Sequence, residues 1–192
     1  MAVFLDRDGT IIKDVNYLSQ LQEVELLPRA AIAIARLNQL QIPVILVSNQ
    51  SGIARGKFSE KFVNETHLYL QKILAREGAH LDDFFFCPHH PEAGTAPYKK
   101  LCNCRKPEPG LLHQAAARHH LDLSKSYVIG DKLIDVELAL RVGGKGILVE
   151  TGYGKNEKEK IYKSKIRPDF IAADLDHAVS WILKKMVTIR KL

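Results

Sequence analysis

Six short apolar segments alternate with longer segments of helical periodicity along this chain of 192 residues. This alternation restricts the fold more than any other feature does, because strand-helix-strand units with right-handed crossovers build a parallel sheet. Several of the segments, such as VILVS and GILVE, are almost continuously apolar, which is typical of strands covered on both faces. The predicted strands are Ala2–Asp6, Pro43–Asn49, Asp83–Cys87, Ser126–Gly130, Gly146–Glu150 and Asp169–Ala172.

Between the strands, apolar residues recur at spacings of three and four, as in amphipathic helices. The predicted helices are Pro28–Gln41, Phe58–Glu77, Pro109–His120, Leu133–Val142 and Asp174–Lys185. Pro28 is expected in the first turn of the first helix, where proline is common. The sequence contains no internal repeat, low-complexity tract or linker. We therefore expect a single α/β domain over residues 1–192, a Rossmann-like three-layer sandwich with a mostly parallel sheet.

The composition is that of an ordinary globular protein, with 46% hydrophobic and 26% charged residues. No apolar run approaches the roughly 18 residues that span a bilayer. Charged residues begin at Asp6, before the apolar region of a signal peptide could form. We therefore expect a cytoplasmic protein that has no membrane partner.

The net charge of +6 favours an anionic partner. The basic residues are not interleaved with aromatic ones, so we expect a small phosphorylated substrate and no nucleic acid. The most basic segment, residues 155–167, also carries Glu157 and Glu159, which indicates a solvated loop or helix face. The basic tail over residues 184–192 is expected to be a frayed terminus. The sequence does not determine the oligomeric state.

All three cysteines lie between residues 87 and 104, where Cys87-x-His89 is followed after twelve residues by Cys102-x-Cys104. Four nitrogen and sulfur ligands in two short pairs suit tetrahedral Zn²⁺, and four protein ligands make a closed, structural site. His90 could replace His89, but the spacing of His89 matches the second pair better. The less favoured alternative is that the cysteines are small core residues and His89 is a surface histidine.

Two aspartates, Asp6 and Asp8, follow the first predicted strand. A carboxylate at a strand end can attack phosphorus, and a second one two residues later, on the same side of the chain, can transfer protons. Mg²⁺ would relieve the repulsion between these carboxylates and a phosphate. Asp131, after the fourth strand, would complete the metal site, and Asp135 would orient ligands or waters from outside the coordination sphere.

Ser48 and Lys106 could hold the oxygens of the transferred phosphoryl group. Each motif also has a purely structural interpretation. The two aspartates could form a turn or a calcium site, Asp131 could begin an ordinary helix, and Ser48 could cap a turn. Because the motifs fall in order on successive strand ends, a catalytic role is favoured over these structural interpretations.

Together these residues resemble the haloacid dehalogenase superfamily of phosphatases, which use an aspartate nucleophile. The resemblance rests on "DRDGT" from Asp6, the strand end at Ser48, Lys106 in "RKP", and "GDKLID" from Gly130. It implies that Asp6 is the nucleophile and Asp8 the general acid and base. It further implies that Mg²⁺ is held by Asp6, the backbone carbonyl of Asp8, and Asp131.

Three further motifs, together with "GDKLID", resemble the phosphatase family that acts on D-glycero-D-manno-heptose 1,7-bisphosphate: "SNQSGIARGKF", "CPHHP" and "CNCRKPEPG". This resemblance implies removal of the C7 phosphate, a product that feeds nucleotide-activated heptose and bacterial surface polysaccharide synthesis, and a zinc-binding loop inserted at residues 87–104. The substrate contacts that it implies are Ser48, Asn49, Gln50, Ser51, Arg105, Lys106 and Lys132.

One departure from the family lies in the loop after the nucleophile, where Asp-His-Gly-Tyr is common and this chain has Asp14-Val15-Asn16-Tyr17. Asp14 and Tyr17 remain candidate substrate contacts. The loop lacks an imidazole and a flexible glycine, so the sequence does not determine whether the α- or the β-bisphosphate is preferred.

The sequence disfavours three alternatives to a phosphatase of this family. A histidinol-phosphate phosphatase shares the aspartates and a similar zinc loop, but Arg55, Arg105 and Lys132 suit a second phosphate better than a cationic substrate. A signalling receiver domain needs neither Asp8 nor a zinc loop. A zinc-stapled binding module without catalysis is disfavoured because every expected catalytic position is filled.

Overall fold

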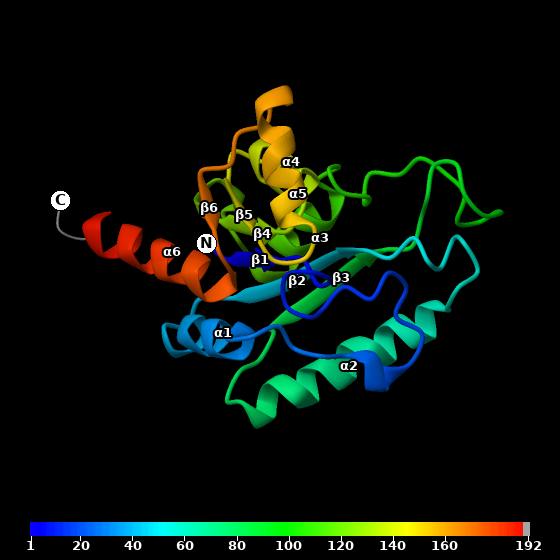
Figure 1. The fold of residues 1–192 in the computed structure, drawn as a ribbon, viewed down its shortest axis with the longest axis horizontal. Coiled ribbons are helices and arrows are strands. Elements are labelled where there is room, and N and C mark those ends of the chain that lie inside the picture. The colour runs from blue at the N-terminus through cyan, green and yellow to red at the C-terminus, as the bar shows by residue number, and fades with distance from the viewer. Residues whose placement is uncertain (190–192) are drawn as a thin grey trace.

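The computed structural model describes residues 1–189, in which six parallel strands form one sheet with helices on both faces (Figure 1). The strands are β1 (Val3–Leu5), β2 (Val44–Asn49), β3 (Asp83–Cys87), β4 (Tyr127–Gly130), β5 (Lys145–Val149) and β6 (Phe170–Ala172). Their order in the sheet is β3-β2-β1-β4-β5-β6, with every neighbouring pair parallel. The direction of winding reverses between β1 and β4, and such a reversal opens a crevice at the carboxyl ends of the strands.

The helices are α1 (Ala30–Gln39), α2 (Glu60–Arg76), α3 (Gly110–His119), α4 (Leu133–Arg141), α5 (Gly154–Lys160) and α6 (Leu175–Ile189). Short 3₁₀ turns lie at Leu21–Glu23, Leu123–Lys125 and Ile161–Lys163. Ser59 explains why α2 begins at Glu60: its side chain accepts a hydrogen bond from the backbone N–H of Phe62 and so caps the helix. No helix within the described residues is long and apolar enough to cross a membrane.

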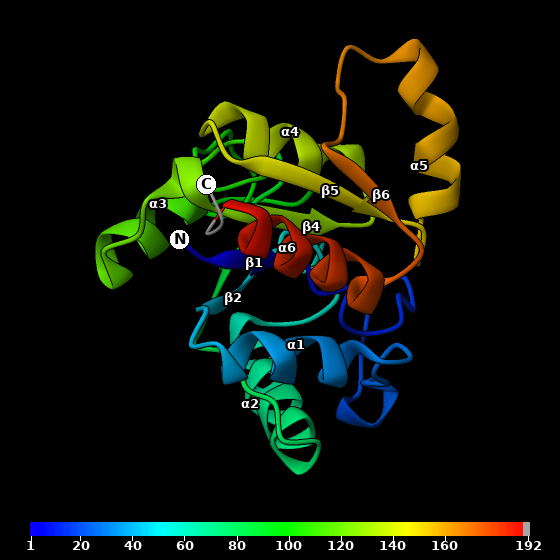
Figure 2. The same ribbon diagram turned by 90° about the vertical axis from the view of Figure 1, so that its left-hand side faces the viewer.

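The two faces of the sheet bury alternate residues of the same strands, as the two-residue period of a strand requires. Val3 and Leu5 of β1 pack in the layer that includes residues of α1, α2 and α6, whereas Phe4 packs among residues of α3 and α4. Figure 2 shows α3 and α4 on the opposite side of the strands from α1 and α2. The three-layer arrangement predicted from the sequence is confirmed.

Two segments differ from the sequence-based expectation, and a third, residues 154–160, adopts the helix that was one of its two expected forms. α1 begins at Ala30 because Arg29 adopts a left-handed conformation (φ 64°), so Pro28 lies before the helix and not in its first turn. Residues 154–160 form α5, and Glu157 on this helix accepts a hydrogen bond from the backbone N–H of Leu133 at the start of α4 (3.0 Å). The helix α6 continues to Ile189, so the tail is not frayed up to that residue. Residues 190–192 of the predicted tail lie outside the described part of the chain.

Candidate active site

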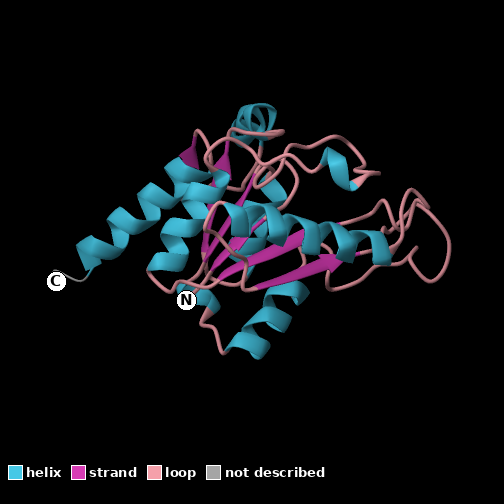
Figure 3. Ribbon diagram, turned by 90° about the horizontal axis from the view of Figure 1, so that it is seen from below, coloured by secondary structure: helices cyan, strands magenta, loops and turns pink. Residues whose placement is uncertain are grey.

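The carboxyl ends of the strands surround a pocket of about 260 Å³. Long loops extend from this end of the sheet (Figure 3). The pocket is lined by most of the residues predicted to act on substrate: Asp6, Asp8, Asp14, Tyr17, Ser48, Asn49, Gln50, Ser51, Lys106 and Lys132. Residues that the sequence analysis assigned to substrate thus line one cavity in the structure.

Lys106 lies beside a cluster of three buried carboxylates, those of Asp6, Asp131 and Asp135, each of which offers one oxygen within 4.8 Å of the others. Its ammonium group is 2.9 Å from Oδ1 of Asp6 and 2.6 Å from Oδ1 of Asp135. It also donates to the backbone carbonyl of Val47 (3.0 Å). Burial opposes the charged form of Lys106, but Asp135 and Asp6 outweigh this effect and raise its pKa.

The carboxyl groups of Asp131 and Asp135 are fully buried, and burial is the main cause of their raised pKa values. The pKa of Asp131 rises to about 7, with the nearby charge of Asp6 as the second cause. The pKa of Asp135 rises to about 6 although Lys106 opposes the rise. Both carboxyl groups therefore take up a proton more readily than an ordinary aspartate, and a bound cation would favour their charged forms.

Asp131 is held tightly, yet one of its oxygens is left without a hydrogen bond. The backbone N–H of Tyr153 donates to Oδ2 (2.8 Å), and a Cβ atom on either Gly9 or Gly152 would lie 2.2 Å from the same oxygen. Oδ1 accepts no hydrogen bond within the described residues, and the Lys132 ammonium stands 3.5 Å away. A buried, unsatisfied oxygen beside two further carboxylates fits the hard, oxygen-preferring Mg²⁺ ion.

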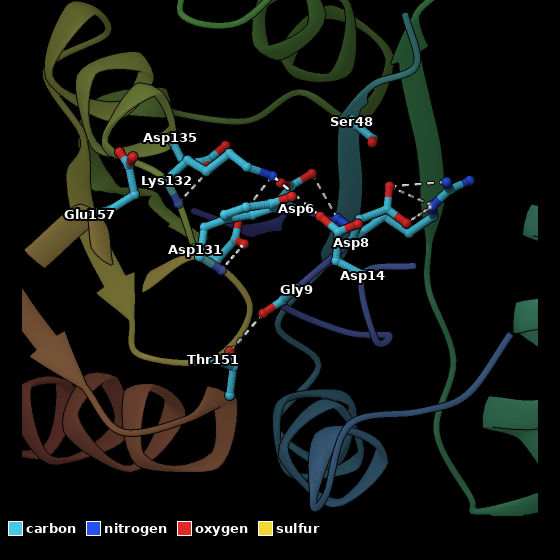
Figure 4. A network of polar contacts seen from close by, with 12 residues as sticks. Asp6, Asp8, Gly9, Asp14, Ser48, Asp131, Lys132, Asp135, Thr151 and Glu157 are labelled. Atoms are coloured by element: carbon cyan, nitrogen blue, oxygen red, sulfur yellow. Dashed lines mark hydrogen bonds and ion pairs between the residues drawn. The ribbon is translucent and has the colours of Figure 1, made fainter. Parts of the chain in front are cut away.

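Asp8 is turned away from this cluster (Figure 4). Its carboxylate accepts hydrogen bonds from Arg7 and Gln50 instead. Arg7 donates to both carboxylate oxygens of Asp8, from Nε to Oδ1 at 3.1 Å and from Nη2 to Oδ2 at 2.9 Å. Gln50 donates to Oδ2 of Asp8 (3.0 Å) and to the hydroxyl of Ser48 (2.7 Å). The carboxylate of Asp8 therefore lines the pocket but does not belong to the cluster of Asp6, Asp131 and Asp135. Arg7 also lines the pocket, but the sequence analysis did not include it among the candidate site residues, although it lies between the two aspartates in the chain.

Asn49 was predicted to contact substrate, but its amide group holds the backbone of Lys106. Its Oδ1 accepts from the Lys106 N–H (3.0 Å), and its Nδ2 donates to the Lys106 carbonyl (3.1 Å). This two-way pairing joins the end of β2 to the loop that follows the cysteines. The pairing therefore fixes the position of the Lys106 backbone, and with it the point from which the side chain extends into the site.

The rim of the pocket contains Lys132, whose ammonium lies 3.7 Å from Oδ2 of Asp14 and 4.6 Å from the ring centroid of Tyr153. Asn16 adopts φ 64°, a conformation that asparagine tolerates better than most residues, so the loop keeps a glycine-like backbone there. Among the residues lining the pocket that the sequence interpretation missed are Phe58, Ile134 and Tyr153. Arg105 does not line it, and its guanidinium donates to the carbonyl of His89 (3.1 Å).

The predicted zinc ligands Cys87, His89, Cys102 and Cys104 form a second cluster, at the end of β3. Cys104 Sγ lies 3.2 Å from Cys87 Sγ, 3.4 Å from Cys102 Sγ and 3.3 Å from His89 Nδ1. Tetrahedral zinc with Zn–S bonds of about 2.3 Å places its sulfur atoms about 3.8 Å apart, so the four groups fit such an ion with slight expansion. The sequence left His90 as the alternative ligand, but its Nδ1 accepts from the backbone N–H groups of Glu92 and Ala93 instead.

Residues 103–178 match the family model described as HAD-hydrolase-like. The chain is 45% identical over 185 residues to the D-glycero-D-manno-heptose-1,7-bisphosphate 7-phosphatase of Thermosynechococcus vestitus, with 94% of each chain covered. The chain belongs to this phosphatase family. The resemblance stated from the sequence motifs is thereby confirmed.

Two further relatives agree with this family assignment. The D-glycero-beta-D-manno-heptose-1,7-bisphosphate 7-phosphatase of Yersinia pestis is 35% identical, covering 99% of this chain and 93% of the relative. A crystal structure of the D,D-heptose 1,7-bisphosphate phosphatase from B. bronchiseptica, complexed with magnesium and phosphate, superimposes with a TM-score of 0.84. Sequence identity to that structure is 34%, and the match covers 96% of this chain and 99% of the other.

Proposed function

We propose that this protein removes the C7 phosphate of D-glycero-D-manno-heptose 1,7-bisphosphate and leaves heptose 1-phosphate. The observation that carries the proposal is the position of Asp6, which belongs to the buried carboxylate cluster and lies near Asp8 (Figure 4). Membership of the phosphatase family supports the choice of substrate.

The nucleophile in this proposal is Oδ2 of Asp6. Both interactions that Asp6 accepts from described groups fall on Oδ1, from the backbone N–H of Arg7 at 2.8 Å and from the Lys106 ammonium at 2.9 Å. Attack by Oδ2 on the C7 phosphorus forms an aspartyl-phosphate and breaks the bond from phosphorus to the sugar oxygen. The hydroxyl of Ser48 and the charge of Lys106 stabilise the phosphoryl oxygens.

Asp8 transfers the protons. Its protonated form donates to the departing sugar oxygen, and its ionised form then takes a proton from the water that attacks the aspartyl-phosphate. Arg7 and Gln50 fix the orientation of this carboxyl group through the contacts described above. Water attack releases inorganic phosphate and restores Asp6.

Two metal sites are part of the proposal. Asp6, Asp131 and the backbone carbonyl of Asp8 would hold Mg²⁺, with Asp135 orienting ligands from outside its coordination sphere. When bound, Mg²⁺ neutralises the charge of the carboxylates and of the phosphate. Cys87, His89, Cys102 and Cys104 would hold a structural Zn²⁺ ion. We also propose a cytoplasmic enzyme in which residues 1–192 form one domain, acting in the synthesis of nucleotide-activated heptose for bacterial surface polysaccharide such as lipopolysaccharide.

The test is phosphate release with Mg²⁺ from three substrates assayed side by side: the α- and β-anomers of heptose 1,7-bisphosphate and histidinol phosphate. We expect one bisphosphate anomer to give the highest kcat/KM. The name of the Yersinia pestis relative makes the β-anomer the first to measure. Faster release from histidinol phosphate would retain the chemistry but refute the substrate.

A further inference from the structure

Thr151 joins two loops at the carboxyl ends of the strands. It lies in the loop between β5 and α5, and its hydroxyl donates to the backbone carbonyl of Gly9 at 2.6 Å (Figure 4). Gly9 is buried, belongs to the loop after β1 and directly follows Asp8 in the chain. Thr151 does not itself line the pocket, so this hydrogen bond acts on the site through Gly9.

The Thr151 side chain extends from a tightly held turn. Its backbone carbonyl accepts a hydrogen bond from the N–H of Gly154 (2.8 Å), and a Cβ atom on Gly154 would lie 1.7 Å from the carbonyl oxygen of Val149. The N–H of Glu150 donates to the carbonyl of Ala172 on β6 (2.8 Å). These backbone contacts fix the turn, so Thr151 can act as an anchor for the loop after β1.

The same turn contacts Asp131. The N–H of Tyr153 donates to Oδ2 of Asp131 (2.8 Å), and a Cβ atom on Gly152 would lie 2.2 Å from that oxygen and 2.6 Å from Cα of Gly9. Only glycine allows so close an approach. Over three consecutive residues, the turn therefore touches both the Asp131 carboxylate and the backbone that follows Asp8.

Gly9 determines where the backbone carbonyl of Asp8 points. The N–H of Gly9 donates to the carbonyl of Ile12 (2.8 Å), and the peptide bond between Asp8 and Gly9 is trans. In a trans peptide the C=O and the N–H point in opposite directions, so the Asp8 carbonyl points away from Ile12. Glycine rotates more freely than other residues, and Gly9 has φ 80°. The hydrogen bond from Thr151 holds the other side of Gly9 and so restricts rotation of this peptide group.

We propose that the Thr151 hydroxyl is a positioning group that sets the place of the Asp8 carbonyl relative to the Asp131 carboxylate. The two groups follow different strands, and the turn that carries Thr151 is in contact with the segments that hold both. Mg²⁺ demands nearly ideal octahedral geometry, so a small displacement of one ligand lowers its affinity. The inference rests on the proposed function, in which both groups hold Mg²⁺.

The experiment measures the Kd of Mg²⁺ for the substrate-free protein by isothermal titration calorimetry. Thr151→Val keeps the branched shape but removes the donor, and we expect it to raise the Kd by about tenfold, as the loss of a hydrogen bond behind a metal ligand commonly does. Thr151→Ser retains a hydroxyl, so its Kd should stay within about twofold of the parent value. The Mg²⁺ concentration that gives half-maximal phosphate release should rise in Thr151→Val by the same factor as the Kd.

Thr66→Val is the matched control. The buried hydroxyl of Thr66 also donates to a backbone carbonyl, that of Phe62 at 2.8 Å, but it does so within α2, a helix that contributes no residue to the lining of the pocket. The control therefore loses a hydrogen bond of the same kind, and its Kd for Mg²⁺ should equal that of the parent whatever happens to Tm.

A Kd within about twofold of the parent value in both Thr151→Val and Thr151→Ala would overturn the inference and leave the proposed function standing. Thr151→Ala removes the same hydroxyl with less bulk, so it decides the matter if valine disturbs the turn. An equal rise in Thr151→Ser or in Thr66→Val would also overturn the inference, because the effect would then not depend on the hydrogen bond to Gly9. A parent that bound no Mg²⁺ would instead refute the metal site of the proposed function.

Discussion

Lys106 is the residue on which the electrostatics of the site depend. Its side chain is almost completely buried and forms ion pairs with Asp6 and Asp135. A buried charge is tolerated only where opposite charges and hydrogen bonds compensate for lost hydration. The carboxylates and Lys106 therefore stabilise one another. Replacing Lys106 should affect the stability of the protein differently from replacing one of the carboxylates.

We predict that Lys106→Met lowers the free energy of unfolding of the metal-free protein by about 3 kcal/mol at pH 8, because it leaves buried carboxylates without their cation. The loss should be smaller at pH 5, since Asp131 and Asp135, with pKa values of about 7 and about 6, then take up protons. Denaturant titrations in the presence of a chelator measure both values. Lys61→Met, on the exposed surface of α2, should have almost no effect; an equal loss at both pH values in Lys106→Met would contradict the explanation.

Asp6→Asn tests the nucleophile. Asp6 is only 6% exposed, and its charge adds to the repulsion within the cluster. The amide cannot form an acyl phosphate, so kcat should fall by at least about a thousandfold. The stability of the metal-free variant should be unchanged or higher, because Lys106 still pairs with Asp135. Phosphate release and denaturant unfolding are both measured; retained turnover would refute the assignment of Asp6.

At the scale of elements, the proposed zinc ion would stabilise the loop over residues 87–104, which holds the four candidate ligands. Leu101 within it is 86% exposed, and few of its residues belong to the hydrophobic core. The loop nevertheless carries His90, and it leads directly into Lys106, whose backbone is paired with Asn49. A disordered loop would thus disturb the phosphoryl-transfer site.

We predict that Cys102→Ser loses the bound zinc and lowers Tm by about 5 °C or more, since a structural zinc site contributes directly to folding. Activity should fall with it, because Lys106 loses its fixed position. Zinc content is measured by atomic emission and Tm by calorimetry. Leu101→Ser introduces the same residue at the neighbouring exposed position and should retain zinc. An unchanged zinc content and Tm in Cys102→Ser would exclude the structural site.

At the scale of the whole molecule, His67 makes the packing of α2 on the sheet sensitive to pH. The imidazole is fully buried against the rings of Phe84 and Phe86, at 4.8 and 5.8 Å between centroids. Neither ring nitrogen has a hydrogen-bond partner within the described residues. Burial, with a smaller effect of the Arg7 charge, lowers the pKa of His67 to about 3.

This pKa determines the sign of the pH dependence. The unfolded chain binds a proton at His67 below about pH 6.5, whereas the folded protein does so only near pH 3. Stability from this group is therefore complete above pH 6.5 and is lost as the pH falls, by up to about 1.4 kcal/mol per pH unit. We predict that His67→Leu flattens this slope, so that its stability relative to the parent rises between pH 7 and pH 5. His113→Leu, on an exposed position of α3, is the control; parallel pH profiles for His67→Leu and the parent would contradict the prediction.

The order of strands and helices was predictable from the sequence because it depends on local periodicity. β3 was predicted with its observed bounds, and the other five strands lie within one residue of the prediction at each end. Helix ends were less predictable where backbone conformation decided them, as at Arg29. α5 is short and almost entirely polar, so its apolar pattern could not distinguish a helix from a solvated loop.

The sequence by itself determined the chemistry available at the strand ends: Asp6 after β1, Ser48 on β2, Cys87 on β3 and Asp131 after β4. In a parallel sheet these ends necessarily meet at one edge. It could not determine which of these side chains touch.

Only the tertiary structure decided the contacts. It brought Asp135 into the carboxylate cluster, placed the ammonium of Lys106 between carboxylates, and turned Asp8 toward Arg7. It also separated His89 from His90, although the two are adjacent in the chain. The physical reason is that burial and side-chain direction depend on packing between segments distant in sequence, which no local pattern records.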